Sequence, residues 1–318
     1  MLQIQSILLP RDFSSASDQA LRHAVQLARA TGAALHVLYA SVLHKGPFAA
    51  TVDSSAETGE KIRAQLLEAP DGSKVTDITG EIQVETAVVR NIAAGPAILD
   101  YADDHDIDTI VMGTHGRRGV RRMLLGSVAE EVVRRAECPV LTVRGQEDQD
   151  FAGDLTLESI LVPIDFSLHS RQALRHAREL AANYNARLDL LHVIEEHLPP
   201  AYYVGGVGSI YDIVPDIEEQ ASQKMMSFYD ETGGPLVEKI TYHAEPGQPA
   251  RHIASFAEEN DSNLIVMSTH GLTGLEHFLM GSVAEKVVRR AKVPVFSVKA
   301  FGKSLLHPDP APTATESS

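Results

Sequence analysis

The sequence contains one cysteine, Cys138, and no long apolar run. A single cysteine excludes a disulfide within the chain, and a reducing cytoplasm is the simplest compartment for such a protein. A membrane-spanning helix needs ~20 consecutive apolar residues, and no stretch here approaches that length. The first residues form neither a basic leader nor a small-residue cleavage site, so we expect a cytoplasmic protein without a membrane partner. Because Cys138 precedes Pro139 at the start of an apolar stretch, we expect it to be buried and unreactive.

Basic residues are scarce relative to acidic ones. The chain has 28 Lys and Arg against 43 Asp and Glu, which gives a formal net charge of −15. Both halves are acidic, at −6 up to residue 150 (15 basic minus 21 acidic residues) and −9 after it (13 minus 22). A protein whose main partner is nucleic acid needs a basic face. The charge balance therefore argues against nucleic acid as a partner.

The most informative pattern is a glycine-rich stretch at residues 113–127. The apolar run before it is typical of a buried parallel strand, and apolar residues at helical spacing follow it. Gly113 and Gly116 predict a backbone that turns with positive φ and that a ligand can approach closely. Gly126 and Ser127 open the following helix, whose first amides have no partner within the helix. Because a helix N-terminus carries partial positive charge, we expect an anion there, typically a phosphate.

The same pattern returns at residues 268–282, again between an apolar run and a helical segment. Nine residues separate Gly116 from Gly126, and nine separate Gly271 from Gly281. Two occurrences with the same spacing and the same surroundings indicate a duplicated unit.

The duplication extends over most of the chain. Residues 159–167 repeat residues 6–14 at an offset of 153, and residues 291–298 repeat residues 136–143 at an offset of 155. Strands and helices alternate within each copy, which predicts a parallel sheet with helices on both faces. The expected organisation is a first domain at 1–146, a linker at 147–156, a second domain at 157–301 and a disordered tail at 302–318.

The apolar patterns of the first copy predict five strands and four helices. The strands are expected at 4–9, 34–40, 83–89, 109–112 and 140–143. The first helix is expected to take its N-cap from residues 14–17 and to end at Gly32. The others are expected to run through Leu66 to about residue 70, from about 96 to 105, and from 127 to 136. In the second copy, residues 198–215 are expected to form a longer loop.

These features together resemble the universal stress protein family. The resemblance rests on the two glycine motifs, on Asp12 and Asp165 after the first strands, and on Pro139 and Pro294 at the start of the last strands. It covers nearly all of residues 1–300 and indicates the tandem form, with two such domains in one chain. It implies an α/β fold of two Rossmann-like (adenine nucleotide alpha hydrolase-like) domains, each a five-stranded parallel sheet of order 3-2-1-4-5 flanked by helices. It also implies ATP, with or without Mg²⁺, at the carboxyl ends of strands one and four.

The resemblance further implies the residues of each site. The family motif Gly-x2-Gly-x9-Gly-(Ser/Thr) falls on Gly113, Gly116, Gly126 and Ser127, and the second copy has Ser268 in place of the first glycine. The first site would comprise Pro10, Arg11, Asp12, Ala40, Met112, Gly113, His115, Gly116, Gly126, Ser127 and Val128. The second would comprise Pro163, Ile164, Asp165, Val193, Met267, Ser268, His270, Gly271, Gly281, Ser282 and Val283.

Several of these residues allow two interpretations. Asp12 and Asp165 could contact a ribose or a metal, or could cap the loop before the first helix. The Arg11 side chain could contact the nucleotide or fill the cleft. For His115 and His270, we favour packing within the loop over catalysis, because no Ser/His/Asp or Cys/His arrangement lies nearby in sequence.

The resulting hypothesis is a stress-response protein that binds ATP or a related adenine nucleotide and acts as a sensor or regulator. No Walker-type lysine follows a glycine loop, and the histidines show no metal-ligand spacing, so we expect slow hydrolysis at most. The alternative is a nucleotide-independent interaction protein with degenerate clefts. By resemblance, strand five of each domain should pair with the other, and the sequence leaves a homodimer open.

Overall fold

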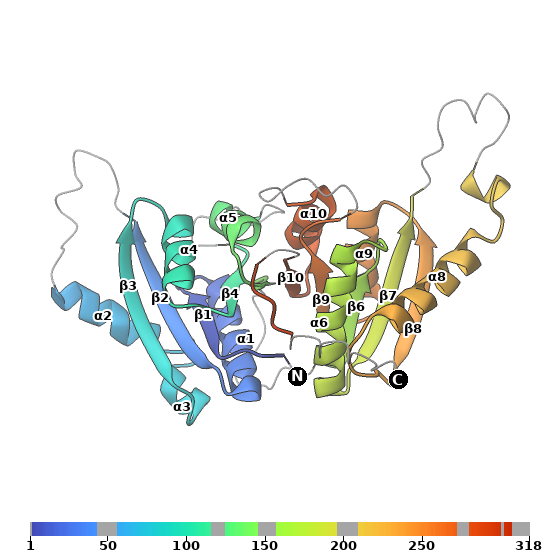
Figure 1. The fold of residues 1–318 in the computed structure, drawn as a ribbon. Coiled ribbons are helices and arrows are strands. Elements are labelled where there is room, and N and C mark those ends of the chain that lie inside the picture. Colours follow the sequence, from blue (N-terminus) through green and yellow to red (C-terminus); the bar gives the residue numbers. More distant parts are fainter. Residues whose placement is uncertain are drawn as a thin grey trace, which may run out of the picture.

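The computed structural model describes residues 2–42, 56–115, 125–145, 157–195, 209–271, 280–299 and 302–306. All ten of its strands lie in one sheet, which runs across the whole molecule in Figure 1. Helices cover both faces of this sheet, and the two halves of the chain form its two ends. The α/β class and the duplication expected from the sequence are both confirmed.

The elements follow the same order in each half. The first half has β1 (Ser6–Pro10), α1 (Ser15–Thr31), β2 (Ala34–Val42), α2 (Ala56–Leu66), α3 (Val75–Thr79), β3 (Val84–Asn91), α4 (Ala94–Asp104), β4 (Thr109–Gly113), α5 (Ser127–Arg135) and β5 (Val140–Val143). The second has β6 (Ser159–Pro163), α6 (Leu168–Tyr184), β7 (Arg187–Ile194), the 3-10 helix η2 (Ile210–Asp212), α8 (Ile217–Glu231), β8 (Ile240–Pro246), α9 (Pro249–Glu259), β9 (Leu264–Ser268), α10 (Ser282–Arg290) and β10 (Val295–Val298).

The strands are arranged β3-β2-β1-β4-β5-β10-β9-β6-β7-β8. Each half is parallel and has the expected order 3-2-1-4-5. The halves meet where β5 and β10 pair antiparallel, with Val295 opposite Thr142 and Phe296 opposite Leu141. The pairing expected between the two fifth strands therefore joins the two sheets into one.

The core consists of two apolar layers, one on each face of the sheet. Alternate strand residues supply the two layers, so that Ile7 and Leu9 pack toward α1 whereas Leu8 packs toward α4 and α5. One layer lies under α1, α6 and α8, and the other under α4, α5, α9 and α10. Both layers continue across the seam between β5 and β10.

Polar contacts also cross the seam. Lys299, just after β10, donates from Nζ to the carbonyl oxygens of Val133 (2.6 Å) and Arg134 (2.8 Å) near the end of α5. Arg144, just after β5, donates from Nη1 to the carbonyl oxygen of Arg290 at the end of α10, at 3.5 Å. The residue that follows each fifth strand thus reaches the carboxyl end of a helix in the other half.

Residues 302–306 differ from the expected tail, because they pack against the first domain. Leu305 is 1% exposed, and its carbonyl oxygen accepts a hydrogen bond from the Gln3 amide at 2.7 Å. The Lys303 amide donates to the carbonyl oxygen of Glu137 at 2.8 Å. The expectation of a disordered tail is therefore wrong for residues 302–306, because Leu305 is buried against the first domain. The rest of the expected tail lies outside the described residues.

Other local expectations have mixed outcomes. Ser14 caps α1 and Gly32 ends it in the left-handed conformation (φ 73°), both as predicted. Cys138 is buried, and burial raises the pKa of its thiol to about 12, as expected of an unreactive cysteine. The five-residue helix α3 is absent from the sequence prediction, since it is too short to show a period. Of the described helices, none combines the length and apolar character needed to cross a bilayer.

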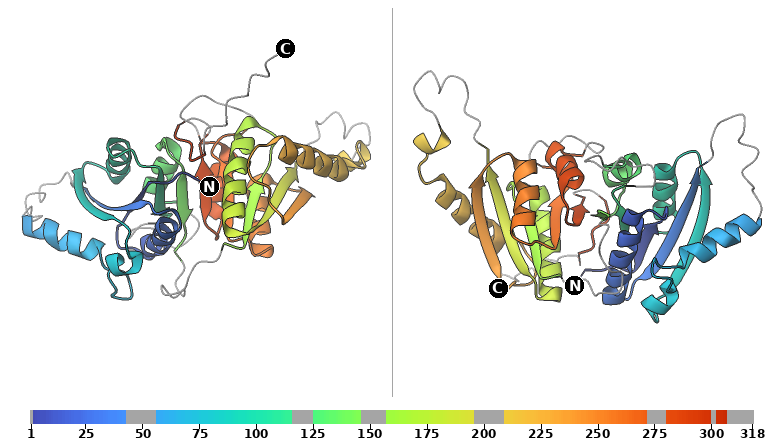
Figure 2. Two further views of the ribbon diagram at one scale, coloured as in Figure 1. Left: turned by 60° about the horizontal axis from the view of Figure 1, so that its bottom comes forward. Right: turned by 180° about the vertical axis from the view of Figure 1, so that it is seen from behind.

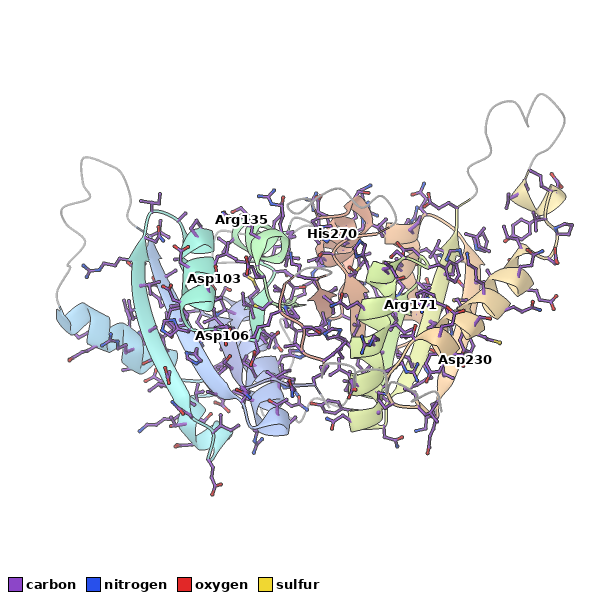
Figure 3. The ribbon with its side chains drawn as sticks, viewed as in Figure 1. Asp103, Asp106, Arg135, Arg171, Asp230 and His270 are labelled. Atoms are coloured by element: carbon purple, nitrogen blue, oxygen red, sulfur yellow. The ribbon has the colours of Figure 1, made fainter. Side chains whose placement is uncertain are left out.

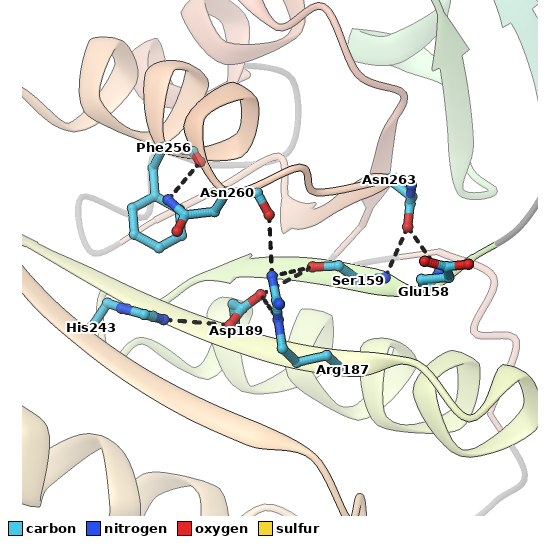
Figure 4. A network of polar contacts seen from close by, with 8 residues as sticks. All are labelled: Glu158, Ser159, Arg187, Asp189, His243, Phe256, Asn260 and Asn263. Carbon is cyan, nitrogen blue, oxygen red and sulfur yellow. Dashed lines mark hydrogen bonds and ion pairs between the residues drawn. The ribbon is translucent and has the colours of Figure 1, made fainter.

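A buried polar network holds the amino ends of the strands in the second half (Figure 4). Asp189 on β7 is 3% exposed, and its Oδ2 accepts from Nε of Arg187 at 2.8 Å and from Oγ of Ser159 at 3.0 Å. Arg187 also donates to the carbonyl oxygen of Asn260 at 3.1 Å. This network connects β6, β7 and the end of α9 at the amino ends of the strands. The glycine motif lies at their carboxyl ends.

Candidate functional site

In the first half, the end of β1 is tied to the start of α1. The backbone amide of Ser14 donates to Oδ1 of Asp12 at 3.1 Å, and the Ser14 hydroxyl lies 2.6 Å from the same oxygen. The same hydroxyl accepts from the Ser17 amide at 3.3 Å and lies 3.2 Å from the carbonyl oxygen of His115. One carboxylate oxygen of Asp12 therefore stabilises the helix cap, and the cap touches the loop that follows β4.

The second half repeats this arrangement. Oδ1 of Asp165 accepts from the Ser167 amide at 3.0 Å and lies 2.6 Å from the Ser167 hydroxyl, which caps α6 through the Ser170 amide at 3.1 Å. A Cβ built on Gly271 would lie 2.8 Å from Oδ2 of Asp165. The carboxylate after the first strand and the second motif glycine thus meet at one edge of the sheet. The equivalent Gly116 lies outside the described residues.

A hydrogen bond closes each motif loop at its base. The Gly126 amide donates to the carbonyl oxygen of Thr114 at 2.8 Å, and the Gly281 amide donates to that of Thr269 at 2.7 Å. A Cβ at Gly126 would lie 2.9 Å from the Thr114 oxygen, and one at Gly281 would lie 3.2 Å from the Thr269 oxygen. The glycine at the third motif position, Gly126 or Gly281, therefore lets the two ends of each loop approach each other.

Helices α5 and α10 start immediately after these glycines without a side-chain cap. Their first intrahelical bonds run from Glu130 to Gly126 (2.9 Å) and from Glu285 to Gly281 (3.0 Å). The amides before these positions, in residues such as Ser127 and Ser282, have no partner within the helix. Together with the helix dipole, such amides can bind an anion.

The first motif position has a different role from the one expected. Gly113 is not among the positive-φ residues, so the predicted left-handed turn there is wrong. A Cβ at Gly113 would lie 2.7 Å from the backbone of Ala16, so glycine is needed because α1 packs directly on the strand end. In the second half, Oγ of Ser268 accepts from the His270 amide at 3.2 Å, so the extra side chain is used within the loop.

The two motif histidines are held by the preceding threonines. Nδ1 of His115 lies 2.9 Å from Oγ1 of Thr114, and Nδ1 of His270 lies 3.0 Å from Oγ1 of Thr269. Thr269 is fully buried, so this contact fixes the ring of His270 at the carboxyl edge of the sheet, near α10 in Figure 3.

Arg11 extends away from the motif, toward the end of α2. It is 4% exposed, and its Nη1 donates to the carbonyl oxygens of Leu66 (3.2 Å) and Glu68 (2.7 Å). Its Nη2 forms a 2.6 Å ion pair with Asp18 on α1. A hollow of about 250 Å³ beside Arg11 is lined by residues of this region and by none of the motif. The equivalent Ile164 packs in the core.

The remaining candidate residues supply apolar surface. Met112 and Met267 are buried beneath α5 and α10, in the core layer that includes both helices. Half-buried positions at the same edge are Pro10, Ala40, Val128, Pro163, Val193 and Val283. Within the described residues, no group of three or more His, Cys, Asp or Glu side chains could hold a metal ion.

From the sequence, Ser14 is expected only as a helix cap, and Ser167, Thr114 and Thr269 are absent from the expected sites. The structure brings them into contact with the candidate aspartates and histidines. The signal was available, since both copies contain Asp-Phe-Ser after the first strand and Thr-His within the motif.

Comparisons with known proteins find similar sequences and a similar fold. The model of the universal stress protein family matches residues 3–144 and 156–299. A universal stress protein of Mycolicibacterium smegmatis is 30% identical over 306 residues, which cover 92% of this chain and 96% of that protein. Universal stress protein MJ0531 of Methanocaldococcus jannaschii is 34% identical over 152 residues, 46% of this chain and 85% of that protein. The crystal structure of a universal stress protein from Archaeoglobus fulgidus shares the fold, with 23% identity and a TM-score of 0.65 over 92% of this chain and 98% of that one.

Proposed function

Because the chain belongs to the universal stress protein family, we propose that it binds ATP or a related adenine nucleotide at the carboxyl edge of each half of its sheet. In this proposal, binding makes the protein a sensor or regulator in a stress response. Its one cysteine is compatible with the reducing cytoplasm, where we propose that it acts.

One observation carries the proposal: in each half, an uncapped helix N-terminus lies at the same sheet edge as the carboxylate that follows the first strand. A polyphosphate needs donors without partners and partial positive charge, and helix N-termini supply both. An adenosine needs apolar surface with a few polar groups. Half-buried Val128 and Ala40, with the Asp12 carboxylate, would meet that need in the first half.

The binding residues would divide the ligand between them. The amides at Ser127 and Val128, and at Ser282 and Val283, would bind phosphate oxygens. Asp12 and Asp165 would face the ribose, or a Mg²⁺ ion carried by the phosphates. The caps from Ser14 and Ser167 would keep these carboxylates oriented. We propose slow hydrolysis at most, because none of the described residues at this edge has contacts that would position it as a general base.

A negative charge at each helix N-terminus tests the phosphate site without disturbing the fold. Ser127→Glu and Ser282→Glu should favour the helix dipole yet repel a phosphate. We expect wild-type protein to bind two equivalents of ATP by isothermal titration calorimetry. Each single variant should lose one equivalent, and the double variant should lose at least about tenfold in affinity at both sites. The matched control is Ser227→Glu on exposed α8, which should bind as the wild type does.

Parallel titrations with ADP and cAMP, and mass spectrometry of whatever the purified protein releases on denaturation, would identify the nucleotide. Unchanged ATP affinity in the folded double variant would reject the site. Absence of any nucleotide binding in the wild type would favour the nucleotide-independent interaction protein. Binding restricted to the first half, with recovery in Ser268→Gly, would assign the difference between the halves to the Ser268 side chain.

A further inference from the structure

A cavity of about 270 Å³ lies between the two halves of the molecule. Its lining includes residues of α1, α6, β5, β9 and β10 and the N-terminal residues Leu2 and Ile4. The N-terminus lies between α1 and α6 in Figures 1 and 2, on the α1 face of the seam. The cavity includes none of the residues proposed to bind nucleotide. Pockets at domain interfaces are a common location for ligand sites.

Most of the cavity wall is apolar and comes from both halves. Leu27 and Leu141 belong to the first half, and Leu180, Leu264 and Phe296 belong to the second. A ligand that fills this space would remove its own apolar surface and that of these side chains from water, which favours binding.

One end of the cavity is polar. Arg144 follows β5. When the antiparallel register of β5 and β10, with Val295 opposite Thr142, is extended by two residues, Arg144 lies opposite Val293, next to Lys292. Ser262 precedes β9, which pairs with β10 in parallel, so Ser262 lies at the same end. Its Oγ is buried without a hydrogen-bond partner, and Ser262 is 3% exposed. A buried hydroxyl without a partner is costly, and a polar ligand atom would relieve that cost.

The charge at this end is positive in a strongly acidic protein. None of the nineteen lining residues is Asp or Glu, although the chain has 43 of them, and the two charged ones are Arg144 and Lys292. Lys292 forms a 2.5 Å ion pair with Glu258. In the part of the chain that the structure describes, Arg144 has only its 3.5 Å bond to a carbonyl oxygen, so it is the cation available to an anionic ligand.

The duplicated half of the chain shows how the equivalent region is filled. At the offset of 155, Asn263 and Lys292 correspond to Asp108 and Glu137. There the chain supplies its own segment: Lys303 pairs with Asp108 at 2.7 Å and donates to the Glu137 carbonyl oxygen, while Leu305 is buried in the core. On the side of Asp108 and Glu137, the chain thus supplies a cation, Lys303, and an apolar side chain, Leu305. On the side of Asn263 and Lys292, the cavity stays open.

We propose that this cavity binds an amphiphilic monocarboxylate, with its apolar body between α1 and α6 and its carboxylate at Arg144. The Ser262 hydroxyl would donate to a carboxylate oxygen. Both halves contribute to the site, so a bound ligand would link the two domains in addition to the seam.

The probe is decanoate, titrated into the full-length protein by isothermal titration calorimetry below its micellar concentration. We expect saturable binding of one equivalent, and weaker binding of hexanoate by up to about fourfold per methylene removed. Decanol, which lacks the charge, should bind at least about tenfold more weakly, and ATP should not compete with decanoate.

Two variants test the two ends of the site. Arg144→Gln should weaken decanoate at least about tenfold and leave decanol unchanged, whereas Arg134→Gln on the exposed face of α5 is the charge-matched control. Leu180→Trp on α6 should fill the cavity and abolish binding of both decanoate and decanol. Leu27→Trp repeats this test from α1 should the first variant fold poorly. Circular dichroism and ATP binding report whether each variant is folded. Non-saturating binding, or decanoate affinity that neither Arg144→Gln nor a folded tryptophan variant changes, would overturn the proposal.

Discussion

Lys299 and Val133 belong to different halves of the chain, yet the Lys299 ammonium lies 2.6 Å from the Val133 carbonyl oxygen. The next carbonyl, that of Arg134, is 2.8 Å away. The last carbonyls of a helix have no partner within it, and a cation near them also interacts favourably with the negative end of the helix dipole. Lys299 therefore caps α5 from the other domain, so that the end of one helix depends on the docking of both halves.

Replacing Lys299 should weaken the packing of the two halves against each other and so lower the stability of the protein. Lys299→Met should lower the free energy of unfolding by about 1–3 kcal/mol, because two buried carbonyls lose their donor. Urea denaturation at pH 7 measures this. The control is Lys292→Met, which breaks an exposed ion pair with Glu258 and should cost about 0–1 kcal/mol.

The same variant should show a dependence on pH. Burial lowers the pKa of Lys299 to about 8, whereas an unfolded lysine titrates near 10.4. Between these values the unfolded chain binds more protons, so stability contributed by this site rises as pH rises. The difference between wild type and Lys299→Met should therefore widen from pH 8 to 10. A constant difference over this range would contradict the assignment.

A second pH dependence should come from His176 on α6. Burial lowers its pKa to about 4, and its Nδ1 lies 2.8 Å from the carbonyl oxygen of Gln172. An unfolded histidine titrates near 6.5, so protons bind the unfolded chain preferentially between pH 6.5 and 4. This site should cost up to about 3 kcal/mol as pH falls through that window.

His176→Leu should remove that cost. Unfolding of the wild type and the variant by urea at pH 7, 6, 5 and 4.5 would measure the difference. The variant should lose less stability toward acid. Parallel curves for the two proteins would contradict the buried, neutral state of this imidazole.

The first motif glycine should matter for stability apart from any ligand. Gly113→Ala would place a Cβ 2.7 Å from the Ala16 backbone and should cost about 1–3 kcal/mol through overpacking. Gly59→Ala is the matched control, because no atom lies within 4 Å of the new Cβ and alanine favours helix α2 by about 0.5–1 kcal/mol. The Tm of thermal unfolding should thus fall in Gly113→Ala and rise in Gly59→Ala. Equal shifts in Tm would refute this role of Gly113.

Much of this architecture could be predicted from the sequence because the two halves of the chain repeat the same pattern. Repeated apolar runs locate the strands, and the repeated glycines locate the edge where the candidate residues meet. The side-chain direction of Arg11 could not be predicted, since its partners are backbone carbonyls near the end of α2, 55 and 57 residues away. The same holds for Gly113, whose neighbour is a helix that comes from a distant part of the chain. Leu305 lacked any periodic context, so its burial depends on tertiary packing alone.

The antiparallel seam changes how this molecule responds to dilution. Two separate single-domain chains that paired through their last strands would part as their concentration fell, since each encounter is bimolecular. Here β5 and β10 are on one polypeptide, which gives each a high effective concentration of the other. The twofold arrangement should therefore persist at any expression level, and another copy of the chain would have to attach elsewhere, for example at the outer strands β3 and β8.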